Sequence, residues 1–84
     1  MKKSRVGTPI SVGETTIIPL ERETVRIHHA RKTKGIMIQC SKEPIGIVVI
    51  TQQGNWAIDI SGKTIPLEIY IKEFDDLQGI LDRL

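Results

Sequence analysis

Hydrophobic and polar positions alternate along most of the chain, as they do in β-strands that bury one face. Short runs rich in isoleucine, valine and threonine are separated at short intervals by glycine or proline, which is typical of successive short strands. A first hairpin is predicted around Gly13 and Glu14, because glycine can adopt the positive φ that a tight turn requires. Pro19 lacks the N–H that a strand ladder needs, so we expect its strand to end there or to lie at an edge of the sheet.

Two further strands are predicted in TVRIHHA, residues 24–30, and GIMIQC, residues 35–40, which we expect to form a hairpin. Successive side chains of a strand point to opposite faces, so the adjacent His28 and His29 are separated by the sheet. Arg26 and His28 are predicted to face outward. The predicted core-facing positions of the two strands are Val25, Ile27, His29, Ile36, Ile38 and Cys40.

The run IGIVVI, residues 45–50, is apolar throughout, as expected of a central strand that is covered on both sides. NWAIDI, residues 55–60, alternates again and places Trp56 in a core-facing register. TIPLEIYI, residues 64–71, is predicted to be the last strand. Alternation places Ile65, Leu67, Ile69 and Ile71 on one face of this strand.

At the C-terminus the apolar period changes from two residues to three or four, which is the spacing of a helix. We predict one helix over residues 72–84, packed on the sheet because so short a helix is marginal alone. Its apolar stripe consists of Phe74, Leu77, Ile80, Leu81 and Leu84. The predicted fold class is therefore α+β: about six short, mainly antiparallel strands with one C-terminal helix packed on the sheet.

With 84 residues, the chain has room for one small domain, which we assign to residues 7–84. Residues 1–6 form a basic lead-in that we expect to be a flexible tail. No run approaches the ~18 apolar residues of a membrane span, and no apolar segment of a secretory signal follows the basic start. The single cysteine excludes a disulfide within the chain and favours a reducing compartment. We expect a cytoplasmic protein without membrane contact.

The net charge of +2 conceals an asymmetry between the two parts of the chain. Residues 1–34 hold eight basic and three acidic residues, whereas residues 35–84 hold four basic and seven acidic residues. Such a split favours either an anion-binding half or a contact between subunits. The candidate binding surface lies in the basic half and consists of Arg22, Arg26, His28, Arg31, Lys32 and Lys34.

Catalytic and metal-binding patterns are weak in this sequence. The two histidines point to opposite faces and cannot chelate one ion together, and no zinc-type ligand spacing is present. A nucleophilic Cys40 would need a base beside it, and a core-facing thiol is typical of an inert residue. SGKT, residues 61–64, leads into a predicted strand instead of the helix N-terminus of a phosphate loop. We therefore predict a non-enzymatic protein without cofactor or metal.

VGTPISVGETTIIPLERETV, residues 6–25, resembles the opening of the sporulation-associated GerW/YtfJ-like family. Gly7 and Pro9 match the Gly-x-Pro lead-in of that family, and TIIP, residues 16–19, matches its TxIIP strand. Residues 34–60 are similar to its second half. The resemblance implies a small β-rich module that acts through contacts, without enzyme activity or cofactor. The chain departs from the family after TxIIP, where VRIHHARKTKG replaces a glycine-rich loop, so the role of that loop is not carried over.

Together these features predict a non-enzymatic interaction module that self-associates, as a dimer in the simplest case, and that has a protein partner not identified by the sequence. The alternative is an RNA- or DNA-binding module that uses the basic half to contact phosphates. We favour self-association, because Glu21 and Glu23 interrupt the basic strip and the chain has only three aromatic residues for base stacking. The charged side chains of the basic strip would also protect an exposed strand edge from pairing with other molecules.

Overall fold

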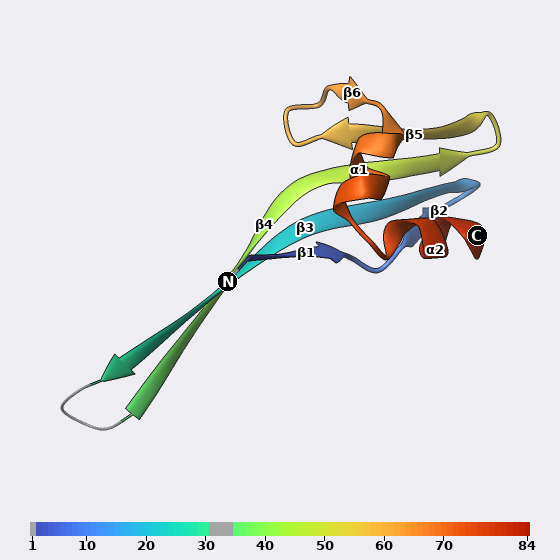
Figure 1. The fold of residues 1–84 in the computed structure, drawn as a ribbon. Helices are drawn as coiled ribbons and strands as arrows, with labels where there is room; N and C mark the ends of the chain where they lie inside the picture. Colours follow the sequence, from blue (N-terminus) through green and yellow to red (C-terminus); the bar gives the residue numbers. More distant parts are fainter. Residues whose placement is uncertain (1, 31–34) are drawn as a thin grey trace.

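The structure is a computed structural model that describes residues 2–30 and 35–84. Six strands form one antiparallel sheet, and two short helices follow them (Figure 1). The prediction of a mostly antiparallel sheet of six strands with helical cover at the C-terminus is confirmed. The elements are β1 (Lys2–Val6), β2 (Ile10–Val12), β3 (Thr15–Ala30), β4 (Gly35–Thr51), β5 (Gly54–Asp59), β6 (Thr64–Ile65), α1 (Leu67–Glu73) and α2 (Leu77–Asp82).

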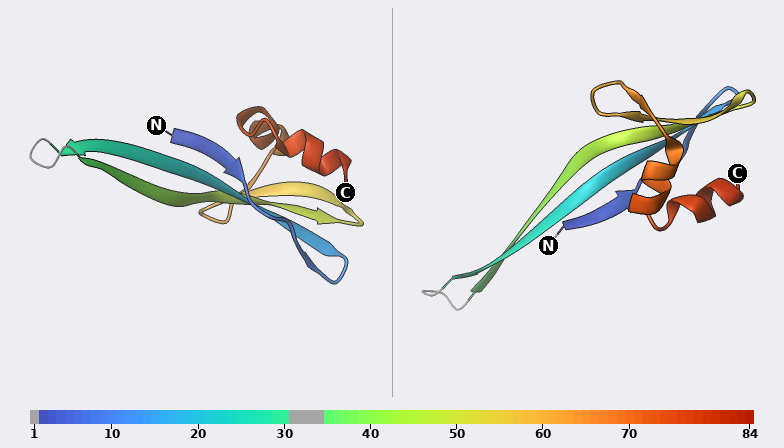
Figure 2. Two further views of the ribbon diagram at one scale, coloured as in Figure 1. Left: turned by 90° about the horizontal axis from the view of Figure 1, so that it is seen from below. Right: turned by 45° about the horizontal axis from the view of Figure 1, so that its top comes forward.

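Two strands are much longer than the others and give the molecule its shape. β3 and β4 hold 16 and 17 residues and pair with each other along their length. The order of strands is β1-β3-β4-β5-β6, and β2 also pairs with β3. Because β5 pairs with β4 only over Gly46–Thr51, the far halves of β3 and β4 project from the rest of the sheet (Figure 2). The molecule accordingly measures 59 × 22 × 20 Å.

We call the projecting hairpin the arm and define it as residues 25–30 of β3 with residues 35–40 of β4. The remainder of the described chain is the body. Within the described residues, β1 follows β3 as far as the pair Lys2↔Thr24, where the arm begins. A two-stranded ribbon is marginally stable in water, so an arm of this length needs an additional contact to be well ordered.

The N-terminal residues differ from the expected flexible tail. Lys2–Val6 form β1, which pairs with β3 from Thr24 to Leu20. The register places Lys3 opposite Glu23 and Arg5 opposite Glu21. Opposite charges on directly opposed strand positions stabilise pairing, which is why a basic segment can join the sheet at this place.

Pro19 lies in the interior of β3, so the prediction of a strand end or an edge position was wrong. The Pro19 carbonyl accepts a hydrogen bond of 2.8 Å from the Gly7 N–H, which shows that the nitrogen of Pro19 faces the same side. On this edge of β3, Pro19 lies opposite residues 7–9, which connect the end of β1 to the start of β2. The sheet therefore accommodates proline where the chain on that side passes from one short strand to the next. The predicted turn at Gly13 is confirmed, with a φ of 61° between β2 and β3.

The C-terminal segment contains two helices where one was predicted over residues 72–84. TIPLEIYI is a strand only at Thr64–Ile65, and α1 begins directly after Pro66, whose φ of −59° suits a helix start. Phe74 adopts an extended conformation, with φ −112° and ψ 98°, and separates α1 from α2. The break turns the chain so that α2 can follow the sheet surface.

The core lies on one face of the sheet, beneath both helices (Figure 2). Tyr70 and Phe74 are buried and their rings meet edge to face, with centroids 5.8 Å apart. Ala57 is fully buried against α1, and Trp56, predicted to face the core, is half-buried on the opposite side. The prediction that residues 45–50 are covered on both sides therefore holds only in part: Val49, on the side away from the helices, is buried, whereas Ile47 on the same side is half-buried. The buried cluster consists of Ile18, Leu20, Val48, Ala57, Tyr70, Phe74 and Leu77.

A β-bulge marks the point where the sheet narrows toward the arm. The register between β3 and β4 shifts at Leu20/Glu21, so that Ile45 is the extra residue of β4. The Tyr70 hydroxyl donates a hydrogen bond of 3.3 Å to the Ile45 carbonyl. Burial raises the pKa of Tyr70, with Asp59 and Glu73 adding to the effect, so this hydroxyl keeps its proton and remains a donor. α1 thus fixes the bulge from above.

The SGKT motif lies in a turn that is organised by Asp59. One carboxylate oxygen, Oδ1, accepts hydrogen bonds from the Ser61 hydroxyl at 2.7 Å, the Ser61 N–H at 2.9 Å and the Lys63 N–H at 2.9 Å. The bond from the Ser61 side chain is the main reason that the pKa of Asp59 lies below its ordinary value of 3.8. The turn closes a hairpin between β5 and β6 and forms no phosphate loop.

The lowered pKa of Asp59 predicts a pH-dependent contribution to stability. A folded-state pKa below the unfolded one gives stability that is present above the unfolded pKa and lost as pH falls through the folded pKa. The difference in free energy of unfolding between the native chain and Asp59→Asn should therefore be larger at neutral pH than well below pH 3.8. Urea unfolding at both pH values measures it. A difference that does not change with pH would contradict the role assigned to the carboxylate.

Candidate functional site

The body exposes an apolar sheet face that neither helix covers. Antiparallel register places Ile17, Val49 and Trp56 side by side in one row across the sheet, with Ile10 continuing it on β2. A second row contains Pro19, Ile47 and Ile58. These residues alternate with the buried cluster, so they point away from the helices. We call this surface the uncovered face of the body; Ile10 is exposed, Val49 is buried between its neighbours, and the other members are half-buried. It consists of Ile10, Ile17, Pro19, Ile47, Val49, Trp56 and Ile58.

The arm also has an apolar face, formed by positions of the same alternation. Ile27, Ile36 and Ile38 are 60%, 64% and 65% exposed. They were predicted to face a core, and that prediction was wrong, because the arm extends past the helices and no other described segment covers it. Cys40 was likewise predicted to be buried and is exposed. This apolar arm face consists of Val25, Ile27, Ile36, Ile38 and Cys40.

Between the two apolar surfaces lies a band of charged side chains of both signs, which we call the belt. Strand alternation and register place on this face Lys3, Arg5, Glu21, Glu23 and Lys42. Within residues 2–30 and 35–84, the one ion pair is that of Arg22 with Glu73, on the opposite face. The opposite charges of the belt lie side by side on neighbouring strands without forming an ion pair among the described residues, so they can also interact with charges on another molecule.

The opposite, polar face of β3, in the arm and at its base, carries the described part of the basic surface that the sequence predicts. Arg22, Arg26 and His28 share this face, because they occupy alternate positions of β3. The Arg22 guanidinium donates to the Glu73 carboxylate at 3.0 Å, and both side chains are about one-third exposed. Arg31, Lys32 and Lys34 lie outside the described residues.

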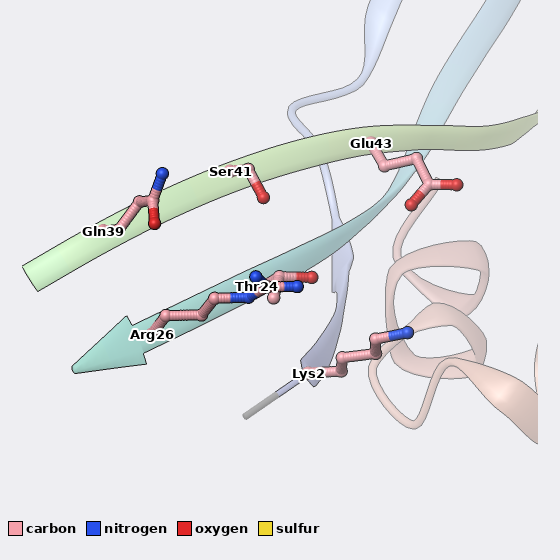
Figure 3. A pocket seen from close by; sticks show the side chains of 6 residues that line it. All are labelled: Lys2, Thr24, Arg26, Gln39, Ser41 and Glu43. Carbon is pink, nitrogen blue, oxygen red and sulfur yellow. The ribbon is translucent and has the colours of Figure 1, made fainter. Parts of the chain in front are cut away.

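A shallow polar depression of about 370 Å³ lies on the polar face at the base of the arm (Figure 3). The Arg26 side chain runs along β3 toward Thr24, and Glu43 faces the same space from β4. An anion entering this depression would meet Arg26 and Lys2 but also the carboxylate of Glu43. The residues lining it are Lys2, Thr24, Arg26, Gln39, Ser41 and Glu43.

The structure places the two histidines and the cysteine apart. His28 pairs with Met37 and His29 with Ile36, so the two imidazoles lie on opposite faces, as predicted. Cys40 pairs with Val25, several residues from either histidine along the strands. Among the described residues, no three His, Cys, Asp or Glu side chains lie close enough together to hold a metal ion. No helix in the described ranges has the length and apolar character needed to cross a lipid bilayer.

Comparison with known proteins gives no match: no family model, curated protein or solved structure is similar to this chain. The surfaces described above therefore have to be interpreted from their own chemistry. Their most unusual property is the amount of apolar side chain on one sheet face. One signal for it was present in the sequence, because Ile17-Ile18 and residues 45–50 are apolar at successive positions. The short C-terminal segment supplies cover for one face only.

Proposed function

We propose that this chain is a non-enzymatic interaction module that self-associates through the apolar faces of its body and arm. The observation that carries the proposal is the exposure of Ile27, Ile36 and Ile38 on a projecting two-stranded arm. Soluble monomers rarely expose contiguous apolar patches of more than a few hundred Å². With strands about 4.8 Å apart and residues rising about 3.4 Å, the two apolar faces and the belt span roughly 700 Å² of sheet plane.

That area is comparable with the roughly 800 Å² that each partner contributes to a standard stable interface. A second copy of the chain is the partner that fits best, because it brings an equally large apolar area together with a belt of both signs. Covering the arm would also supply the contact that a two-stranded ribbon lacks. Self-association therefore removes exposed apolar surface from water and stabilises the arm.

We also propose that the chain is a divergent relative of the GerW/YtfJ-like family. The support is the resemblance of residues 6–25 to the opening of that family, a segment that runs from the end of β1 through β2 into β3. The segment that replaces the family's glycine-rich loop begins in the arm strand of β3. The arm is thus the feature in which this chain departs most from the proposed relatives, and we assign its contact function to this chain alone.

Sedimentation equilibrium of the unmodified chain tests self-association. We expect a dimer at micromolar concentration that persists in moderate salt, because apolar burial contributes more than the screened belt charges. A strict monomer at high micromolar concentration would contradict the proposal.

Nucleic-acid binding is the second candidate, favoured by the placement of Arg22, Arg26 and His28 on one face. The described aromatic residues do not support it as stacking platforms, since Tyr70 and Phe74 are buried and Trp56 lies on the other face. We expect a short single-stranded oligonucleotide to bind weakly at low salt and not at physiological salt. Fluorescence anisotropy measures this. Tight binding that Arg26→Ala weakens would instead favour the nucleic-acid function.

A further inference from the structure

We infer that the second copy binds in a reciprocal manner, with the apolar arm face of each chain packed on the uncovered face of its partner's body. This inference rests on the proposed self-association and specifies its geometry. Two other dimers are conceivable, one that packs arm on arm and one that packs body on body. Either leaves one pair of apolar surfaces exposed, whereas the reciprocal arrangement covers all four.

The layout of β3 favours the reciprocal arrangement. The strand runs from Thr15 to Ala30, and the belt residues Glu21 and Glu23 flank its centre. The body half and the arm half are therefore of nearly equal length. A twofold axis near Arg22 places Ile27 over Ile17 of the partner subunit and Val25 over Pro19 of the partner subunit. The row of Val25 and Cys40 then meets the row of Pro19 and Ile47, and the row of Ile27 and Ile38 meets the row of Ile17 and Val49. The outermost row of the arm, His29 with Ile36, lies over Thr15 of the partner subunit.

The belt lies at the centre, so the same twofold operation places it on the belt of the partner. Glu21 then lies over Glu23 of the partner subunit and Lys3 over Arg5 of the partner subunit, and the oppositely charged side chains of the two belts are diagonal neighbours from adjacent strands. The belt therefore does not select this axis, which rests on the match of the apolar rows. An isologous contact of this kind needs no other component.

The twist of the hairpin is compatible with the arrangement. The β3–β4 ribbon turns about its axis between body and arm (Figure 1). A flat partner surface could not stay in contact with the apolar side of such a twisted ribbon along its whole length. A second copy has the same twist, so two ribbons related by a twofold axis can coil around each other with their apolar faces in contact.

Trp56 and Cys40 are the only tryptophan and the only cysteine of the chain, and they allow a direct test. Trp56 lies on the uncovered face of the body and Cys40 on the apolar arm face. Cys40 is nine residues along β4 from Val49, the neighbour of Trp56, which is about 30 Å at strand rise. A nitroxide on Cys40 quenches tryptophan only on contact, so it cannot reach Trp56 of its own chain.

The experiment mixes a nitroxide-labelled Trp56→Phe chain with the unlabelled native chain. In the mixture, quencher and tryptophan are always on different molecules. We expect strong quenching in the mixed dimer. A matched control carries Cys40→Ser with Ser41→Cys, which moves the label to the polar face of the arm, and should give little quenching. A mixed dimer without quenching would overturn the reciprocal geometry and leave self-association standing, whereas absence of any dimer of the native chain would overturn the proposed function.

A second measurement needs no label on the contact surface. Ile27→Glu on the arm and Ile10→Lys on the body should each weaken self-association when present alone. A mixture of the two variants forms one native arm–body contact and one Glu–Lys contact per reciprocal dimer, so it should associate at least about tenfold more tightly than either variant. A mixture no tighter than its components would contradict the inference, whatever the labelled chain shows.

Discussion

Replacing Ile38 by glutamate should convert the proposed dimer into a monomer. Ile38 is 65% exposed at the centre of the apolar arm face, so within its own chain the substitution affects mainly the cross-strand neighbour Ile27. In the dimer the carboxylate would be buried against apolar side chains without a partner, which costs several kcal/mol before compensation by water. Because both chains of a twofold dimer carry the substitution, this cost in free energy arises twice. We expect the dissociation constant to rise by at least about 100-fold, equivalent to about 2.7 kcal/mol, and sedimentation equilibrium measures it.

Met37→Glu is the matched control for this prediction. Met37 is 64% exposed, adjacent to Ile38 on the same strand, and faces the polar side of the arm opposite His28. The two variants therefore introduce the same charge at nearly the same place and differ in the face that receives it. The Met37 variant should remain dimeric. Dissociation of both variants to the same extent would show that charge on the arm, and not loss of one apolar face, controls the association.

The alternation of the sequence predicts which side chains share a face but not which face is covered. Register bears out the separation of His28 from His29 and the grouping of Ile36, Ile38 and Cys40. Burial of that group did not follow, because periodicity contains no information on whether a second layer reaches so far along a hairpin. Trp56 was assigned to the core for the same reason. Alternation shows that Trp56 and Ala57 point to opposite faces of β5, but not that α1 packs on the face of Ala57.

The helix boundary was missed because one segment supports two periods. Leu67, Ile69 and Ile71 alternate as in a strand, whereas Leu67, Tyr70 and Phe74 have the spacing of a helix. Local sequence does not decide between these patterns. The sheet decides, since Tyr70 and Phe74 are buried against it only when the segment is helical. Tertiary packing therefore determines the structure of residues 67–73, and the candidate surface depends on it because α1 occupies one face and leaves the other open.

Gly46→Ala should destabilise the body strongly, although it adds a single methyl group. Gly46 pairs with Leu20 and Asp59 at the bulge, beneath α1. A Cβ at this position would overlap the Tyr70 hydroxyl and lie 2.5 Å from the Ile58 carbonyl oxygen. We expect a loss of about 3 kcal/mol in the free energy of unfolding, because overpacking in a core forces neighbouring groups to move. Urea unfolding should be followed in the monomeric Ile38→Glu background, so that association does not contribute.

A control and a double-mutant cycle separate steric overlap from the general effect of replacing glycine. Gly79 lies within α2 and a Cβ there meets no atom within 4 Å, so Gly79→Ala should stabilise the chain by up to about 1 kcal/mol. Tyr70→Phe alone should cost about 1 kcal/mol, since the Ile45 carbonyl loses its donor. In the Gly46→Ala background the same change removes an overlapping atom, so its cost should fall or reverse. If the effects of the two substitutions on the free energy of unfolding simply add, the strain lies at the Ile58 carbonyl instead. The backbone of β5 cannot shift there without disturbing its pairing with β4.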